Sequence, residues 1–349
     1  MIYLVCYDWR NTSNNHAGMR YLCKYLEETY PHEFKSLVMP REKKHKLLRN
    51  NLFFRVCYKI RSIIDKRNCN SELQKFVLNF LPILKNNDIV FLMEYMSKSI
   101  NQYLIAKEIK KIYPSIKIYG LSHLVPSKID KDFSDCDLIK WTSCIDKLVT
   151  FGHSLSDYYV SRHIPKENVF TSFHYVDDYY LNNNIVKHEN VTVIVTGSQM
   201  RNTKLLLQIV LSNPDIHFYI CQGLDNLSSV FTTPNVTLIP FVEESELRNY
   251  MYNSDISLNV MYDTIGSNVI VTSMGMGLGM ICSDVGSIRD YCDENNTIFC
   301  NSLDDFNNAL NLLTSDSAKL ESFRRSAYMK AKGSFSIENF YRDIMKITE

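Results

Sequence analysis

The chain has 349 residues, of which 45% are hydrophobic and 22% charged, and its formal net charge is +1. Because a single core usually holds roughly 100–200 residues, this length favours two domains. The apolar fraction excludes a disordered chain. The near-zero net charge argues against a dedicated nucleic-acid binder, so we expect no nucleic-acid partner.

Ten cysteines are spread along the chain without a Cys-x-x-Cys pair. A zinc site needs clustered thiolates or imidazoles, so we predict no structural metal. Four of the cysteines lie in apolar, strand-like runs typical of buried reduced thiols: Cys6, Cys221, Cys282 and Cys300. Charged residues interrupt the first apolar stretch, and no run reaches about eighteen apolar residues. We therefore expect a cytoplasmic protein without a membrane-spanning segment.

Short apolar runs alternate with helical patterns along the chain. In the first half we predict strands at residues 2–6, 34–39, 88–93, 116–121, 147–151 and 168–175, and helices at 18–30, 100–113 and 154–163. A polar, Asn-rich stretch at 178–190 predicts a linker. After it we predict strands at 191–196, 216–221, 236–240, 256–260, 280–282 and 298–300, and helices at 204–211, 244–252, 268–276 and from 303 onwards.

This alternation predicts an α/β fold in which parallel sheets are covered by helices on both faces. We expect an N-terminal Rossmann-like domain at residues 1–184, a second one at 185–330, and a C-terminal helix at 331–349 that packs back towards the first domain. Ligands of doubly wound sheets bind at the carboxyl ends of the strands. The prediction is therefore two doubly wound domains that face a central cleft.

One segment carries a strong local charge. Residues 41–67 contain ten basic and two acidic side chains, a net charge of +8, which leaves −7 for the rest of the chain. Apolar residues within 52–64 follow helical spacing, with basic residues on another side. A basic amphipathic helix of this kind binds anionic membrane surfaces. The alternative is a helix that packs on the core and leaves its basic face in water.

The segment at residues 263–290 contains the clearest site pattern. Gly266, Ser267 and Asn268 precede a helical run, which predicts a helix N-cap there. The free amides and the positive dipole end of a helix N-terminus bind phosphate groups. Three glycines then lead from the helix into the next strand: Gly275, Gly277 and Gly279. Taken by itself, a glycine turn of this type is common in α/β proteins.

The order S-N-V, helix, M-x-x-G, short strand, S-D-V-G resembles the donor-site signature of GT-B glycosyltransferases, specifically the family 4 group. Three further segments resemble that family in the same order: residues 147–177, 195–206 and 234–260. The resemblance implies a retaining, metal-independent transferase that uses a nucleotide-diphosphate sugar and no cofactor. It implies that the domain at 1–184 binds the acceptor and that the domain at 185–330 binds the nucleotide-sugar donor. It also implies a set of donor-binding residues: Gly197, Ser198, Arg201, Lys204, Phe241, Val242, Gly266, Ser267, Asn268, Val269 and Thr272.

The sequence departs from the family pattern at several of these positions. The two glutamates of the family fall on Thr264 and Thr272, so neither carboxylate is present. A threonine hydroxyl binds a ribose hydroxyl more weakly than a carboxylate does. Ser198 stands at the usual arginine position, which leaves Arg201 and Lys204 as the basic candidates for the diphosphate. The nearest approach to a metal-binding Asp-x-Asp is at 135–137, in a polar stretch that we expect to be a loop.

In the first half, Gly18 and His123 are the candidate catalytic residues. Gly18 opens the first predicted helix, where the family has a glycine loop against the transferred sugar. His123 lies at the carboxyl end of the strand at 116–121, just beyond its last residue. The family often has an active-site histidine there. The alternative for His123 is a structural hydrogen bonder.

The resemblance implies transfer of a sugar to a hydroxyl of a glycan or lipid-linked glycan, as in surface polysaccharide synthesis. A lipid-linked acceptor would account for the basic segment at 41–67, which would hold the enzyme peripherally on the inner face of the membrane. The alternative is a catalytically silent partner subunit or nucleotide-sugar-binding module of the same fold. A third interpretation is a nucleotide-sugar epimerase, which would need more carboxylates and histidines at its site.

Overall fold

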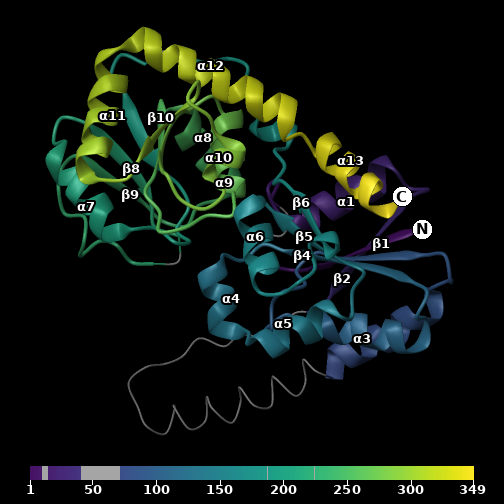
Figure 1. The fold of residues 1–349 in the computed structure, drawn as a ribbon. Coiled ribbons are helices and arrows are strands. Elements are labelled where there is room, and N and C mark those ends of the chain that lie inside the picture. Colours follow the sequence, from purple (N-terminus) through teal and green to yellow (C-terminus); the bar gives the residue numbers. More distant parts are fainter. Residues whose placement is uncertain (10–14, 41–70, 187, 224) are drawn as a thin grey trace, which may run out of the picture. The chain divides into compact units, whose positions relative to one another are not determined.

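The computed structural model describes residues 1–9, 15–40, 71–186, 188–223 and 225–349 (Figure 1). The basic segment predicted to bind a membrane, at 41–67, lies outside the described residues. The chain divides into two compact units. Unit 1 comprises Met1–His123, Ile129–Val149 and Arg162–Val169, and unit 2 comprises Leu124–Lys128, Thr150–Ser161 and Phe170–Glu349. The domain boundary near residue 185 stays a prediction.

The first sheet has six strands in the order β2-β1-β3-β4-β5-β6. The pairs β2·β1, β1·β3 and β3·β4 are parallel. Five of the six residues of β1 are buried, which explains its continuous apolar run, since a central parallel strand is covered on both faces. The strands are β1 (Ile2–Tyr7), β2 (Phe34–Met39), β3 (Ile89–Leu92), β4 (Lys117–Ser122), β5 (Lys147–Phe151) and β6 (Val169–Ser172).

Helices connect these strands. Helix α1 (Met19–Thr29) buries residues at positions i, i+3, i+4 and i+7, the spacing of an amphipathic helix. Residues 71–80 are also helical. The others are η1 (Leu81–Ile83), α3 (Tyr103–Ile112), α4 (Pro126–Asp132), α5 (Asp135–Thr142), α6 (His153–Ser161), η2 (Lys166–Asn168) and η3 (Asp178–Tyr180).

The second sheet has six parallel strands in the order β12-β11-β10-β7-β8-β9. Figure 1 shows α7 and α11 on one side of it and α8, α9 and α10 on the other. Its strands are β7 (Thr192–Val195), β8 (His217–Cys221), β9 (Val236–Ile239), β10 (Ile256–Asn259), β11 (Gly279–Ser283) and β12 (Thr297–Cys300). Its helices are α7 (Thr203–Ser212), α8 (Glu244–Tyr252), α9 (Asn268–Gly275), α10 (Ile288–Tyr291), α11 (Leu303–Ser315), α12 (Ser317–Ser334) and α13 (Ile337–Thr348).

The predicted fold class is confirmed, because both sheets are parallel and carry helices. All twelve predicted strands are present, and their bounds shift by a few residues at most. The prediction of a loop at 135–137 is wrong. Ser134 and Asp137 form a reciprocal capping box there and begin helix α5. Helices α4 and α10 were not predicted, since both are too short to show a helical period.

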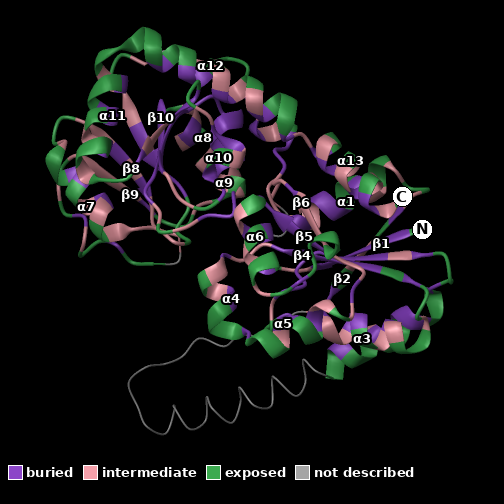
Figure 2. Ribbon diagram, in the orientation of Figure 1, coloured by how far each residue is buried: buried purple, intermediate pink, exposed green. Residues whose placement is uncertain are grey.

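The described cysteines are free thiols. Cys6, Cys282 and Cys300 are buried, as predicted. Cys221 is only partly buried, because β8 alternates buried and half-buried residues. The core of the second sheet collects apolar side chains from its strands and from α7, α11 and α12 (Figure 2).

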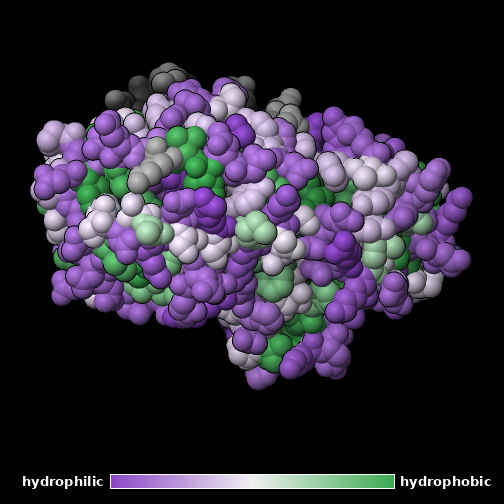
Figure 3. All heavy atoms as spheres, turned by 90° about the horizontal axis from the view of Figure 1, so that it is seen from above, coloured by the Kyte–Doolittle hydropathy of each residue, from purple (hydrophilic) through white to green (hydrophobic). Residues whose placement is uncertain are grey.

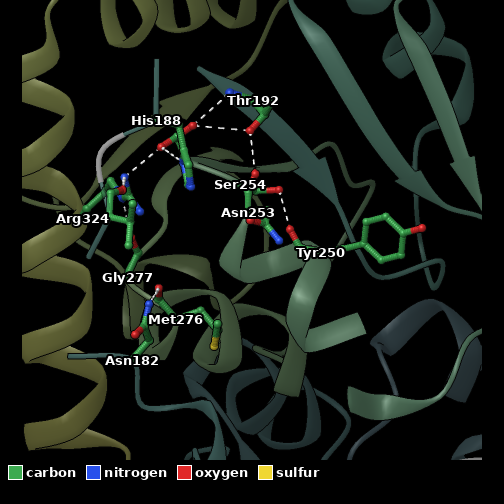
Figure 4. Close-up of polar contacts among 11 residues, drawn as sticks. Asn182, His188, Thr192, Tyr250, Asn253, Ser254, Met276, Gly277 and Arg324 are labelled. Atoms are coloured by element: carbon green, nitrogen blue, oxygen red, sulfur yellow. Dashed lines mark hydrogen bonds and ion pairs between the residues drawn. The ribbon is translucent and has the colours of Figure 1, made fainter. Parts of the chain in front are cut away.

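A buried ion pair joins five segments of unit 2, one of which is the start of β7 at Thr192 (Figure 4). The Nη1 atom of Arg324, on α12, donates to Oδ1 of Asp255 at 2.8 Å and to the carbonyl of Val186 at 2.8 Å. Its Nε atom donates to the carbonyl of Gly277 at 2.8 Å. The second carboxylate oxygen of Asp255 accepts from the amide of Thr192 at 3.0 Å. The pair therefore ties α12 to the linker, the α9–β11 turn and the start of β10.

In the part of the chain that the structure describes, no helix is long and apolar enough to cross a membrane. Figure 3 shows one face of the protein, on which hydrophobic residues lie in small groups among hydrophilic ones.

Candidate functional site

The order in which successive strands are added to the second sheet changes direction between β7 and β10. From β7 it runs through β8 to β9, and from β10 it runs the other way through β11 to β12. Ligands of doubly wound sheets bind beyond the carboxyl ends of the strands at such a switch point. The loops that follow β7 and β10, together with the first turn of α9, contain seven of the predicted donor-binding residues: Gly197, Ser198, Arg201, Gly266, Ser267, Asn268 and Val269.

The backbones of these two loops are joined directly. Arg201 and Met261 form an isolated antiparallel bridge. The amide of Asn202 donates to the carbonyl of Val260 at 2.9 Å, and the amide of Tyr262 donates to that of Met200 at 2.9 Å. The structure therefore brings together two segments that are about sixty residues apart in the sequence.

The N-terminus of α9 offers open amides at this point. Ser267 is the N-cap residue and makes no side-chain cap hydrogen bond. The carbonyl of Ser267 accepts from the amides of Ile270 and Val271. The preceding amides, of Asn268 and Val269, donate to no acceptor among the described residues. Unpaired amides at the positive end of a helix dipole form an anion site.

Two glycines allow the chains to come close here. A Cβ atom on Gly197 would lie 3.1 Å from a methyl group of Val269, so the β7 loop lies directly against the first turn of α9. Gly266 has a φ of +78°, and a Cβ atom there would overlap the ring of Tyr291. The approach to the α9 N-terminus therefore requires glycine at position 266.

The guanidinium group of Arg201 forms hydrogen bonds with backbone carbonyls inside the protein. Its Nη2 atom donates to the carbonyls of Thr196, Gly197 and Cys221. Burial lowers the pKa of this guanidinium below its usual value. Its Nε atom is buried and has no hydrogen-bond partner in the described chain. Arg201 therefore fastens the ends of β7 and β8 together through Nη2, and its Nε atom remains for a further acceptor.

Lys204 differs from Arg201 in its surroundings. It is exposed in the first turn of α7 and forms no ion pair within the described residues. The helix is already capped by Asn202, whose side chain accepts from the amide of Leu205 at 3.1 Å. The ammonium group of Lys204 is therefore available to an anionic ligand.

The two threonines at the family's glutamate positions form local hydrogen bonds. The hydroxyl of Thr272 donates to the carbonyl of Asn268 at 2.6 Å, within its own helix. The hydroxyl of Thr264 accepts from the amide of Gly266 at 3.1 Å. Both residues are buried. Their hydroxyls therefore support the shape of the loop, and Thr272 as a ribose ligand stays a prediction.

Phe241 and Val242 follow β9, two strands away from β7 in the sheet order. Phe241 is 50% exposed and Val242 is half-buried.

Asp263, beside Thr264, is half-buried, and burial raises the pKa of its carboxyl group. The carboxylate accepts from the amide of Thr264 at 2.7 Å.

The two candidate catalytic residues, Gly18 and His123, belong to unit 1. Gly18 is the N-cap of α1, and its amide donates to the carbonyl of Asn15 at 2.7 Å. His123 directly follows β4, and desolvation lowers its pKa to about 4. The imidazole is therefore neutral at pH 7, when it can donate one hydrogen bond and accept another.

Sequence reasoning missed two residues at the carboxyl edge of the first sheet, Trp9 and Glu94. Each lies just beyond the end of a strand, as His123 does. Glu94 is buried and Trp9 is exposed, a contrast that the sequence does not show. Among the described residues, no group of three or more His, Cys, Asp or Glu side chains could hold a metal ion. Metal independence stays a prediction.

No model of a known protein family matches the sequence, and no curated protein sequence matches it. Solved structures do match. HepE of Anabaena in complex with UDP aligns over 99% of both chains, with 12% identity and a TM-score of 0.72. A glycosyltransferase of Rickettsia africae aligns over 99% of this chain and 97% of its own, with 14% identity and a TM-score of 0.64.

The N-terminal domain of trehalose-6-phosphate phosphatase of Candida albicans aligns over 99% of this chain and 96% of its own, with 11% identity and a TM-score of 0.70. At such identities the likeness concerns the fold. The protein therefore has the GT-B fold, with two Rossmann-like domains of six parallel strands each.

Proposed function

We propose that the protein transfers a sugar from a nucleotide-diphosphate donor to a hydroxyl group of a glycan or lipid-linked glycan. The observation that carries the proposal is the α9 N-terminus, where the amides of Asn268 and Val269 have no acceptor within the described part of the chain and lie beside Gly197 at the switch point of the second sheet. UDP is the nucleotide in the HepE complex, so a UDP-sugar is the first donor to test.

The chemistry of sugar transfer suits this arrangement. Departure of the nucleoside diphosphate places negative charge on its phosphate oxygens, and a preorganised positive environment stabilises that charge. The helix N-terminus and the ammonium group of Lys204 supply it. We place the reaction in family 4 of the GT-B enzymes, with retention at the anomeric carbon and without a metal, on the basis of the sequence resemblance. His123 and Gly18 are then the residues assigned to the transferred sugar.

The lipid-linked acceptor and the membrane surface are part of the same proposal. The support for both is the charge of +8 on residues 41–67, which would bind anionic lipid on the cytoplasmic side. Sedimentation with anionic vesicles tests it. Charge reversal at Lys43, Lys44, Lys46 and Arg49 should abolish the binding, and unchanged binding would contradict it.

A titration with UDP tests the donor site. Lys204→Ala removes one charge-assisted contact with a phosphate, so we expect about tenfold weaker UDP binding by calorimetry. Lys332→Ala removes an exposed lysine at the end of α12 and serves as the matched control with unchanged affinity. Absence of UDP binding by the wild-type protein, or equal affinity in both variants, would overturn the assignment of the site.

The second candidate is a catalytically silent module that binds nucleotide sugars. It is favoured by Thr264 and Thr272, which replace the carboxylates of the family and form local hydrogen bonds. Release of UDP from UDP-glucose in the presence of glycan acceptors separates the two candidates. Turnover that Lys204→Ala reduces supports the transferase, and UDP binding without turnover supports the module.

A further inference from the structure

The first sheet has a switch point of its own, between β1 and β3. From β1 the chain moves to β2 on one side, and from β3 it continues through β4 to β6 on the other. A ligand of this sheet is expected beyond the carboxyl ends of β1 and β3. Trp9 lies two residues beyond the end of β1, and Glu94 lies two residues beyond the end of β3.

Trp9 is an exposed aromatic residue at this point. It is 42% exposed, whereas the other tryptophan, Trp141, is 6% exposed. Its ring packs against the edge of Tyr7, with ring centroids 5.2 Å apart and an interplanar angle of 72°. A large aromatic surface that is held in place but left in contact with water is typical of a binding site.

Glu94 holds Trp9 from inside the sheet edge. The side chain of Trp9 donates a hydrogen bond to the Glu94 carboxyl group. The Oε2 atom of Glu94 accepts from the amide of Tyr7 at 3.0 Å. Gln102 completes the support, since its Oε1 atom accepts from the Glu94 amide at 2.9 Å and its Nε2 atom donates to the carbonyl of Val5 at 2.9 Å. The indole of Trp9 is therefore fixed through a buried network.

The Glu94 carboxyl group is also incompletely satisfied. The residue is 1% exposed, and its Oε1 atom has no hydrogen-bond partner among the residues that the structure describes. Burial raises the pKa of the carboxyl group well above its usual value. A buried polar atom without a partner is uncommon in native proteins and marks a place where a ligand or water completes the network.

A charged pair lies next to Trp9 in the sequence. The Nη1 atom of Arg20 donates to Oδ1 of Asp8 at 2.9 Å, and both side chains are partly exposed. Saccharides present an apolar ring face together with a rim of hydroxyl groups. Trp9 offers an aromatic ring, and the Asp8–Arg20 pair, which adjoins it in the sequence, offers a carboxylate and a guanidinium, so the segment supplies groups for both parts. A nucleoside base would use the aromatic ring but would leave the charged groups, which bind hydroxyls, without a partner in the ligand.

We propose that Trp9 forms a saccharide-binding subsite at the switch point of the first sheet, with Asp8 and Arg20 beside it and Glu94 as its positioning residue. This deepens the proposed function, because such a subsite in a glycosyltransferase binds the acceptor glycan. Trp9 stacks on the sugar ring, and Asp8 and Arg20 bind its hydroxyl groups.

The test uses the full chain and a panel of methyl glycosides of glucose, galactose and N-acetylglucosamine. The variant Trp141→Phe leaves Trp9 as the only tryptophan, so its fluorescence reports on this place alone. We expect at least one glycoside to protect Trp9 from iodide quenching, and uridine not to. Protection by uridine alone, or by none of these compounds, would overturn the proposal.

Saturation-transfer NMR measures the same binding without the fluorophore. We expect Trp9→Ala to weaken glycoside binding about tenfold and Trp9→Phe to weaken it less, because phenylalanine keeps a smaller ring. Tyr25→Ala removes another exposed aromatic residue of unit 1 and serves as the matched control with unchanged binding. Equal binding by Trp9→Ala and the control would reject the subsite.

The role of Glu94 is tested by two substitutions. Glu94→Gln keeps an oxygen acceptor for the indole, so we expect glycoside binding to persist. Glu94→Ala releases the indole, so iodide should quench Trp9 more strongly and glycoside affinity should fall. If iodide quenching of Trp9 and glycoside affinity are both unchanged in Glu94→Ala, Glu94 does not position Trp9. UDP affinity is measured in parallel: glycoside binding without UDP binding would retain this subsite and reject the donor site.

Discussion

Arg201 and Lys204 show how differently two neighbouring basic residues are used. Both follow the same strand–glycine turn, and the sequence assigns both to the diphosphate. In the structure the Nη2 atom of Arg201 bonds to three backbone carbonyls, whereas Lys204 is exposed. The carbonyls that receive Arg201 come from the ends of two strands, and only folding brings those ends together. The sequence shows the basic residues but not the acceptors that surround them.

The lowered pKa of His123 predicts that the stability of the protein changes at acid pH. The pKa of His123 is lowered to about 4 in the folded protein, against about 6.5 in the unfolded chain. Between these two values the unfolded state binds more protons, so the free energy of unfolding falls as the pH is lowered from about 6.5 to about 4. The slope from this group is at most about 1.4 kcal/mol per pH unit.

Urea denaturation across this pH range measures the slope. We expect His123→Gln to flatten the fall, because glutamine does not titrate. His32→Gln, at an exposed histidine, is the matched control and should leave the pH dependence of stability as in the wild type. If His123→Gln and the wild type lose stability in parallel, burial of a neutral imidazole is not the cause.

At the scale of elements, hydrogen bonds between capping side chains and the first backbone amides explain where several helices begin. Ser302 and Asp305 form the capping box of α11, and Ser134 and Asp137 form that of α5. Both carry the Ser-x-x-Asp spacing, which the sequence displays. The start of α11 was predicted at residue 303, whereas α5 was not predicted. Helix α9 differs because its cap makes no side-chain bond, and that difference is visible only in the structure.

The ion pair of Arg324 and Asp255 predicts a large effect on stability. Without the guanidinium, the buried carboxylate of Asp255 keeps, among the described residues, the His188 imidazole and the amide and hydroxyl of Thr192 as partners. Removing one partner of a buried pair costs about 3–5 kcal/mol. We expect Arg324→Met to lower the free energy of unfolding by about that amount in urea. Arg325→Met breaks an exposed pair with Glu321 one residue later, and there we expect a change of no more than about 1 kcal/mol. Similar losses in the two variants would show that burial does not govern the effect.

At the scale of the whole molecule, the predicted donor-binding residues all lie in unit 2, and Trp9 and Glu94 lie in unit 1. A ligand stabilises the part of a protein that binds it by mass action. Two units with separate cores unfold in more than one step. We therefore expect calorimetry to resolve two transitions, of which UDP raises the temperature of one.

Lys204→Ala should reduce that UDP-dependent shift without changing either transition in the absence of the nucleotide. A protease that cleaves the unfolded unit, added during heating, identifies by mass spectrometry which unit melts in each transition. A UDP-dependent shift of the transition assigned to unit 1, with none in unit 2, would contradict the placement of the donor site.

The sequence by itself determined the alternation of strands and helices, the twelve strands, and the candidate loops at the ends of β7 and β10. These follow from local patterns, since apolar runs, glycines and capping residues act over a few positions. Only the tertiary structure decided that β7 and β10 are neighbours, that Arg201 faces carbonyls, and that Glu94 is buried behind an exposed Trp9. Strand order and burial depend on contacts between residues far apart in the chain, and one sequence carries no local signal of them.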